Sequence, residues 1–136
     1  MHTRVPELTE SIGETLLTPH INYTRPVLAL LAEKIKIKGI AHISGGGVLE
    51  NIPRILPEGC AVEIDRAACP VLPIFKLLQK VGQLPDSEAY RTFNMGIGLV
   101  MIVSPDVVAE MRSLLKEYPL YEIGRVLSGK REVRLL

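Results

Sequence analysis

An apolar run, Ile97 with Leu99 to Val103, limits the possible folds more than any other segment of the chain. Successive side chains of a strand point to opposite faces of a sheet, so a strand that is apolar at every position is normally buried on both faces. The run is also far too short to cross a membrane as a helix. The sequence therefore predicts a central strand with other elements covering each face.

Three segments have the pattern of amphipathic helices. Residues 26–35, 73–82 and 104–118 carry apolar side chains at helical spacing. Ser104 suits an N-cap, and Pro105 suits the first helical position, where a missing NH costs nothing. The sequence therefore predicts three helices that bury one face each.

Shorter segments complete the predicted architecture. Residues 39–44 and 60–64 are typical of strands, and residues 121–127 and 132–135 indicate a closing hairpin. We expect an α+β fold: a three-layer α/β/α-like domain with a mixed β-sheet, partly ferredoxin-like in topology. Residues 1–20 show no sustained period and are interpreted as an interdomain linker or arm, which leaves 21–136 as the domain.

Composition excludes several classes of function. The sixteen Lys and Arg nearly balance the fifteen Asp and Glu, so the chain has no strong positive field and nucleic acid is not an expected partner. Cys60 and Cys69 lack the partners of a zinc site or a disulfide framework. The first ten residues lack the apolar core of a secretion signal, and no run suits a membrane span, so we expect a soluble cytoplasmic protein.

A glycine loop is the strongest functional signal in the residues themselves. Gly45, Gly46 and Gly47 follow a predicted strand and precede a short helix at 48–52. Adjacent residues without side chains allow backbone NH groups to converge on an anion, and a helix start would add attraction. The loop matches neither the Walker nor the dinucleotide motif, so a plain strand-to-helix turn remains an alternative.

A second group of polar residues and glycines precedes the apolar run. Asn94, Gly96 and Gly98 stand where a ligand can approach a strand closely, although a bulged entrance with Asn94 in a left-handed turn explains the pattern equally well. His42 can bind phosphate or transfer a proton, but a lone histidine is more often a packed residue. His2 and His20 have weaker claims. We predict no catalytic residue and no metal site within this chain.

Several segments together resemble aminoimidazole ribonucleotide synthetase, also called phosphoribosylformylglycinamidine cyclo-ligase. They are residues 39–57, which read GIAHISGGGVLENIPRILP, 64–66, which read IDR, 70–75, which read PVLPIF, and 90–98, which read YRTFNMGIG. Residues 16–19 and 23–31 resemble the segment that links the two domains of this family and the first helix of the second domain. The resemblance covers nearly the whole chain and identifies it as the carboxyl-terminal domain.

The resemblance implies a reaction in which ATP phosphorylates the amide oxygen of formylglycinamidine ribonucleotide, after which an internal amine closes the imidazole ring. The family's amino-terminal domain holds ATP and magnesium and forms a homodimer, and nothing here resembles that domain. The expected partners are therefore a ribonucleotide substrate and the missing ATP-binding domain, and the chain alone is expected to be inactive and to bind neither cofactor. The substrate or phosphate site implied for this half comprises His42, Ser44, Gly45, Gly46, Gly47, Asn94, Gly96 and Gly98.

Two other functions stay open at the level of sequence. One is a stand-alone module that binds a phosphate ligand, or assembles with other proteins, without turnover. The other is a different substrate, because selenophosphate synthetase, thiamine-monophosphate kinase and formylglycinamidine ribonucleotide synthetase share the two-domain architecture. Residues 91–98 look most like the cyclo-ligase.

Overall fold

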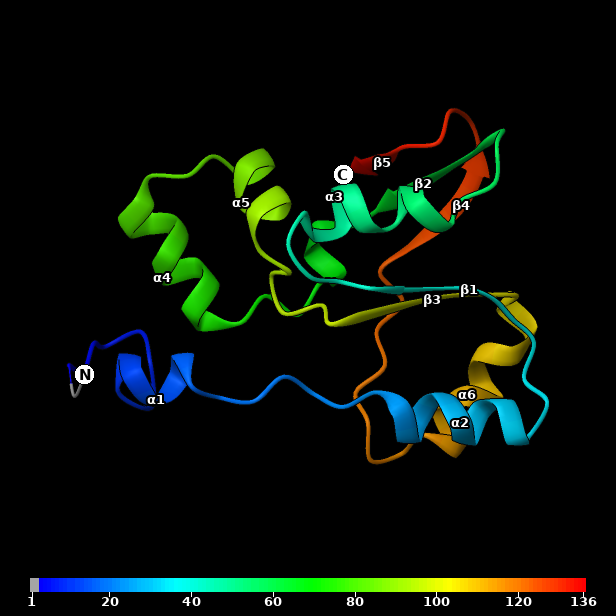
Figure 1. The fold of residues 1–136 in the computed structure, drawn as a ribbon, viewed down its shortest axis with the longest axis horizontal. Helices are drawn as coiled ribbons and strands as arrows, with labels where there is room; N and C mark the ends of the chain where they lie inside the picture. The colour runs from blue at the N-terminus through cyan, green and yellow to red at the C-terminus, as the bar shows by residue number, and fades with distance from the viewer. Residues whose placement is uncertain (1–2) are drawn as a thin grey trace.

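The computed structural model describes residues 3–136 (Figure 1). The helices are α1 (Ile12–Leu16), α2 (Thr24–Ala32), α3 (Gly47–Asn51), α4 (Pro73–Gly82), α5 (Asp86–Thr92) and α6 (Val108–Leu114). The strands are β1 (Ile37–His42), β2 (Cys60–Ile64), β3 (Leu99–Val103), β4 (Gly124–Ser128) and β5 (Val133–Leu135). Short 3-10 helices occupy Pro53–Ile55, Arg66–Ala68 and Pro105–Val107. The predicted helix that Pro73 opens is confirmed; Gly82 is its last helical residue, and the left-handed C-cap is Gln83 (φ 51).

The apolar run forms β3, and both of its faces have apolar neighbours, although all five residues are only partly buried. Val100 and Ile102 pack against one buried cluster, whereas Met101 and Val103 pack against a second cluster that α2 and α6 share. The prediction of a central strand is wrong, because among the described residues β3 pairs only with β1, in an antiparallel ladder. The two faces of β3 are covered by the two hydrophobic clusters that pack against them, and the strand is not in the middle of a sheet.

The remaining strands form a separate mixed sheet in the order β4-β2-β5. The predicted closing hairpin is wrong: β4 pairs antiparallel with β2, and β5 pairs parallel with the other edge of β2. Ala61, Val62 and Ile64 of β2 are buried, so the backbone groups on both of its edges need partners inside the protein. The α+β class is confirmed, but the strands form two sheets instead of one, and the ferredoxin-like topology is not confirmed.

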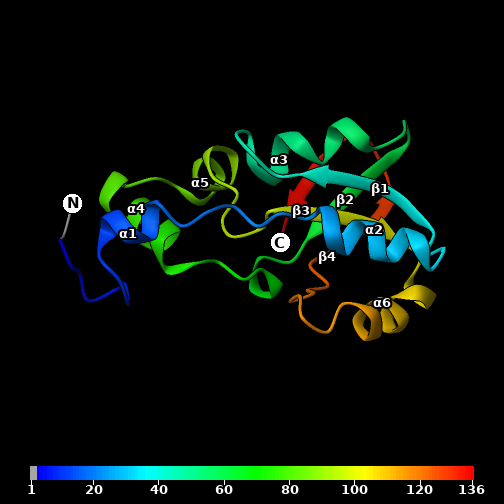
Figure 2. The same ribbon diagram turned by 60° about the horizontal axis from the view of Figure 1, so that its bottom comes forward.

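The two hydrophobic clusters lie on opposite sides of the β1–β3 pair. In Figure 1 the helices α2 and α6 lie below this pair, and α3 with the β4-β2-β5 sheet lies above it. The turned view in Figure 2 keeps α3 and α6 on opposite sides of the strands. The predicted cap of the last helix is not made, since the Ser104 side chain forms no capping hydrogen bond and Pro105 opens a 3-10 turn.

The arm contains the short helix α1, which was not expected because the apolar residues of this segment have no regular spacing. Ser11 caps α1: the NH of Glu14 donates to the Ser11 hydroxyl at 3.3 Å, and the NH of Ser11 donates to the Glu14 carboxylate at 3.0 Å. The hydrogen bonds from the Ser11 side chain and backbone lower the pKa of Glu14. Lys80 of α4 pairs with Glu7 at 3.1 Å, which ties the arm to the domain. None of the helices within residues 3–136 has the length and apolar character needed to cross a bilayer.

The two cysteines should differ in reactivity. Burial, and then the charge of Asp65, raises the pKa of the Cys69 thiol, while Cys60 is partly exposed. Because the thiolate is the reactive form, we expect iodoacetamide to modify Cys60 of the native chain first and Cys69 only after unfolding in urea. Peptide mass spectrometry measures both rates. A Cys60→Ser chain serves as the control, and rapid native alkylation of its Cys69 would contradict the prediction.

Candidate functional site

A pocket of about 280 Å³ lies where the chain before α2 passes the end of β1 and the segment after α5. This volume is close to the lower end of the range for small-molecule sites. The pocket is lined by His20, His42, Ile43, Ser44, Gly45, Phe75, Thr92, Phe93 and Asn94. It therefore brings together four of the predicted site residues, from two segments about fifty positions apart.

In the glycine loop, the backbone carbonyl groups have hydrogen-bond partners within the described chain and most of the NH groups do not. All four carbonyl groups of Ser44–Gly47 accept hydrogen bonds within the chain, from the NH groups of Gly47 (3.0 Å) and Glu50 (3.1 Å) and from the Asn51 side chain (3.2 and 2.8 Å). In contrast, the NH groups of Ser44, Gly45 and Gly46 have no acceptor among residues 3–136. A loop whose acceptors are engaged and whose donors are free is suited to bind an anion.

Asn51 is the residue that sequence reasoning missed in this loop. Its side chain is 6 % exposed, and its amide nitrogen bridges the carbonyls of Gly45 and Gly47. A buried carboxamide normally has hydrogen-bond partners, so an asparagine shortly after a glycine run was the available signal. The short α3 helix has only five residues, so we assign no dipole attraction to it.

Asn94 closes the opposite side of the pocket. Its side-chain oxygen accepts the NH of Gly96 at 3.0 Å, which leaves the amide nitrogen without a partner in the described chain. The left-handed residues of this turn are Met95 (φ 53) and Gly96 (φ 99), which directly follow Asn94. The turn presents Asn94 as a hydrogen-bond donor beside Ser44 and Gly45.

Three of the predicted site glycines do not line the pocket and instead permit close packing. A methyl group on any of them would meet another atom far inside van der Waals contact: Gly47 the carbonyl of Tyr90 at 2.0 Å, Gly96 the carbonyl of Pro70 at 2.5 Å, and Gly98 the hydroxyl of Tyr23 at 2.0 Å. Gly46 also lies outside the lining, with φ 97. The structure thus gives Gly47, Gly96 and Gly98 a packing role.

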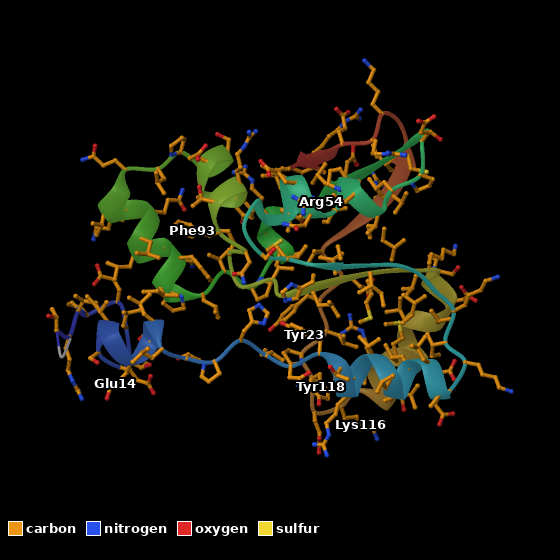
Figure 3. All side chains as sticks on the ribbon, in the orientation of Figure 1. Glu14, Tyr23, Arg54, Phe93, Lys116 and Tyr118 are labelled. Atoms are coloured by element: carbon orange, nitrogen blue, oxygen red, sulfur yellow. The ribbon has the colours of Figure 1, made fainter. Side chains whose placement is uncertain are left out.

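The lining is polar at one end and aromatic at the other. The rings of Phe75 and Phe93 lie 5.7 Å apart, and Figure 3 places Phe93 beside α4 and α5. The rings of His20 and His42 lie 5.0 Å apart. Tyr23 lies beneath the β1–β3 pair in Figure 3, and burial raises the pKa of its hydroxyl, which stays neutral near pH 7.

The composition of the pocket lining is compatible with an anion. None of the described residues that line it carries a carboxylate. Two carboxylates lie just outside the lining: Glu88 accepts a hydrogen bond from the Thr92 hydroxyl at 3.2 Å, and Glu50 would contact a methyl group on Gly46 at 2.8 Å. An anion is therefore better placed beside Ser44, Gly45 and Asn94 than beside Gly46.

The described residues offer no metal centre. Within residues 3–136 no group of three or more His, Cys, Asp or Glu side chains is arranged to hold a metal ion. The site therefore consists of hydrogen-bond donors, two imidazoles and an apolar wall.

Comparison with known proteins assigns the domain. The family described as "AIR synthase related protein, C-terminal domain" matches residues 2–136. The chain belongs to this family. The resemblance found in the sequence is thereby confirmed.

Curated members of the family give the assignment more detail. The chain is 50 % identical over 131 residues to a phosphoribosylformylglycinamidine cyclo-ligase of Caldicellulosiruptor saccharolyticus, with 95 % of this chain and 38 % of that protein covered. A cyclo-ligase of Streptococcus gordonii is 45 % identical over 129 residues, which cover 94 % of this chain and 37 % of the relative. The chain thus spans little more than a third of the length of the relatives it matches.

Among solved structures, the chain is similar to HypE of E. coli, a hydrogenase maturation protein. The TM-score is 0.62 at 26 % sequence identity, over 83 % of this chain and 36 % of that one. This likeness supports the α+β fold that places the family's glycine loop beside the pocket.

Alanine substitutions should separate the packing glycine from the lining glycine. Gly47→Ala places a methyl group 2.0 Å from the Tyr90 carbonyl at a positive φ, whereas Gly45→Ala meets nothing within 4 Å. We expect Gly47→Ala to lower the free energy of unfolding by about 3 kcal/mol and Gly45→Ala to change it by less than about 0.5 kcal/mol. Urea denaturation measures both, and equal stabilities would contradict the packing role.

Proposed function

We propose that this chain is the carboxyl-terminal domain of an ATP-dependent ligase that cyclises formylglycinamidine ribonucleotide to aminoimidazole ribonucleotide in de novo purine biosynthesis. Two curated cyclo-ligases that are 45–50 % identical to nearly the whole chain support this proposal. The part assigned to this domain is to hold and orient a phosphate-bearing ligand.

One observation carries the assignment: the glycine loop engages all of its carbonyls internally and leaves three consecutive NH groups without acceptors. Those NH groups belong to Ser44, Gly45 and Gly46, and the first two residues line the pocket. The Ser44 hydroxyl and the Asn94 amide nitrogen add two further donors beside them. Preorganised donors stabilise a negative group without having to reorganise, which is the main electrostatic resource of a rigid site.

Positioning is the contribution that the chemistry of ring closure needs most. In such a ligase ATP converts the amide oxygen into a phosphate leaving group, and an internal amine then attacks the same carbon. The attack requires the amine and the carbon to be held close and aligned, which fixed contacts to a remote phosphate achieve. The pocket supplies those contacts, and Phe75 and Phe93 supply an apolar wall that limits access of water from that side.

ATP, magnesium and the homodimer are assigned to the rest of the enzyme. The described residues do not fit a magnesium site, so no metal step is given to this chain. The matched region covers 38 % of the Caldicellulosiruptor relative, and the remainder leaves room for an ATP-binding domain. Inactivity of this chain alone, a ribonucleotide substrate and a cytoplasmic location remain predictions.

A chimaera tests the proposed activity. The amino-terminal part of the Caldicellulosiruptor cyclo-ligase, fused to this chain in place of its matched region, should release phosphate from ATP only when formylglycinamidine ribonucleotide is present. We expect turnover within about tenfold of the parent enzyme, since half of the exchanged residues are identical. A folded chimaera that binds ATP but shows no turnover beside an active parent would reject the proposal. Phosphate binding by the chain without any turnover would favour a stand-alone binding module.

The loop's part in binding is tested by Gly45→Val. The substitution adds bulk where the free chain has room, so the fold should persist while the ligand is pushed away from the NH groups. We expect affinity for ribose 5-phosphate to fall at least tenfold in calorimetry, with an unchanged circular dichroism spectrum. Ala109→Val, at an exposed site on α6, is the control for added bulk. Unchanged affinity in Gly45→Val would remove the loop from the site.

A further inference from the structure

The pocket lining includes His20, which is not among the predicted site residues. His20 lies on the segment between α1 and α2, and it lines the pocket together with His42 at the end of β1. Their ring centroids are 5.0 Å apart with planes tilted by 51°, and the ring of Tyr23 meets His20 edge-on at 5.8 Å. Both histidine side chains are exposed. The arm therefore does not simply pass the domain but contributes a side chain to the site.

The hydrogen bond of His20 decides which of its nitrogens is available. Nδ1 lies 3.1 Å from the carbonyl oxygen of Ile21. A carbonyl oxygen only accepts, so Nδ1 carries the hydrogen and Nε2 is left for another partner. Neither ring nitrogen of His42 has a hydrogen-bond partner among residues 3–136. Two neighbouring imidazoles thus offer free nitrogens to the same pocket.

The residues around His20 and His42 indicate that a ligand bound here would be an anion. The described lining contains no carboxylate that could balance an imidazolium, and its other polar groups are the Ser44 hydroxyl, the Thr92 hydroxyl and the Asn94 side chain. The Thr92 hydroxyl donates to Glu88 at 3.2 Å, so its hydrogen is already used. An imidazole NH donates a hydrogen bond to an oxygen atom of a bound anion. A phosphate group fits this set, because its oxygens accept from several directions at once.

We propose that His20 and His42 hold the phosphate of a phosphomonoester between them, so that the arm is part of the ligand site of this domain. The inference rests on the proposed function and extends it, since it adds the arm to the loop as a phosphate contact. The bland alternative is that the two rings only pack together and fix the path of the arm. Replacing His20 with a ring that lacks nitrogens distinguishes phosphate binding from packing alone.

The experiment is a titration of the ¹⁵N-labelled 136-residue chain, followed through its backbone amides and imidazole nitrogens. Ribose 5-phosphate and inorganic phosphate should shift Nε2 of His20, the His42 nitrogens and the amides of Ser44 and Gly45 with one dissociation constant. Ribose should shift none of them. ATP is the competing source of phosphate, and shifts of His20 by ATP but not by ribose 5-phosphate would overturn the assignment to a phosphomonoester.

Variants give the second part of the test. His20→Phe keeps the ring contact and removes the donor, so ribose 5-phosphate should bind about tenfold more weakly, while the amides of the arm keep their chemical shifts. Thr18→Ala, on the same arm but outside the pocket lining, should bind within about twofold of the parent chain. Unchanged affinity in His20→Phe would reduce His20 to a packing residue.

The two failures are distinguishable. Shifts at Ser44 and Gly45 without a shift at His20 would overturn this inference and leave the loop's role intact. Absence of any phosphate-induced shift in the parent chain would overturn both.

Discussion

The buried carboxamide of Asn51 is the contact on which the site depends. It occupies the carbonyls of Gly45 and Gly47, and the backbone NH groups of Gly47 and Glu50 occupy the other two carbonyls of the loop. A backbone turn with all of its acceptors engaged has a net surplus of donors, whatever its side chains are. The polarity of the loop is therefore fixed by one side chain that never faces the ligand.

Gly47 brings the two halves of the site together. A side chain at this position would overlap the Tyr90 carbonyl and come within 2.8 Å of the Phe93 carbonyl. Its absence lets α3 and the end of α5 touch, which sets Asn94 opposite Ser44. The glycine run thus serves two separate purposes, since Gly45 leaves space for a ligand and Gly47 leaves space for the backbone of a distant segment.

Sequence reasoning succeeded where the information is local. The α4 helix, the β2 and β3 strands and the two-faced burial of β3 follow from the spacing of apolar residues, and the family follows from contiguous segments. The division into two sheets did not follow, because which strand edges meet is decided by tertiary packing: the turn at 129–132 carries the chain across the end of β2 instead of back along β4. The Ser11 and Glu14 capping box was readable from its spacing and was missed through attention to period alone.

Some of the site residues could likewise be predicted from local sequence patterns, and others could not. His42, Ser44, Gly45 and Asn94 belong to segments with a recognisable pattern, and the structure gathers them in one pocket. His20 stands in a segment whose pattern is weak, so only its position beside His42 gives it a role. The described lining holds no Lys or Arg, so binding relies on NH groups, a hydroxyl, an amide and imidazoles. Donors of this kind contribute roughly 1 kcal/mol each. A handful of them would give the proposed phosphate ligand an affinity of about millimolar to micromolar.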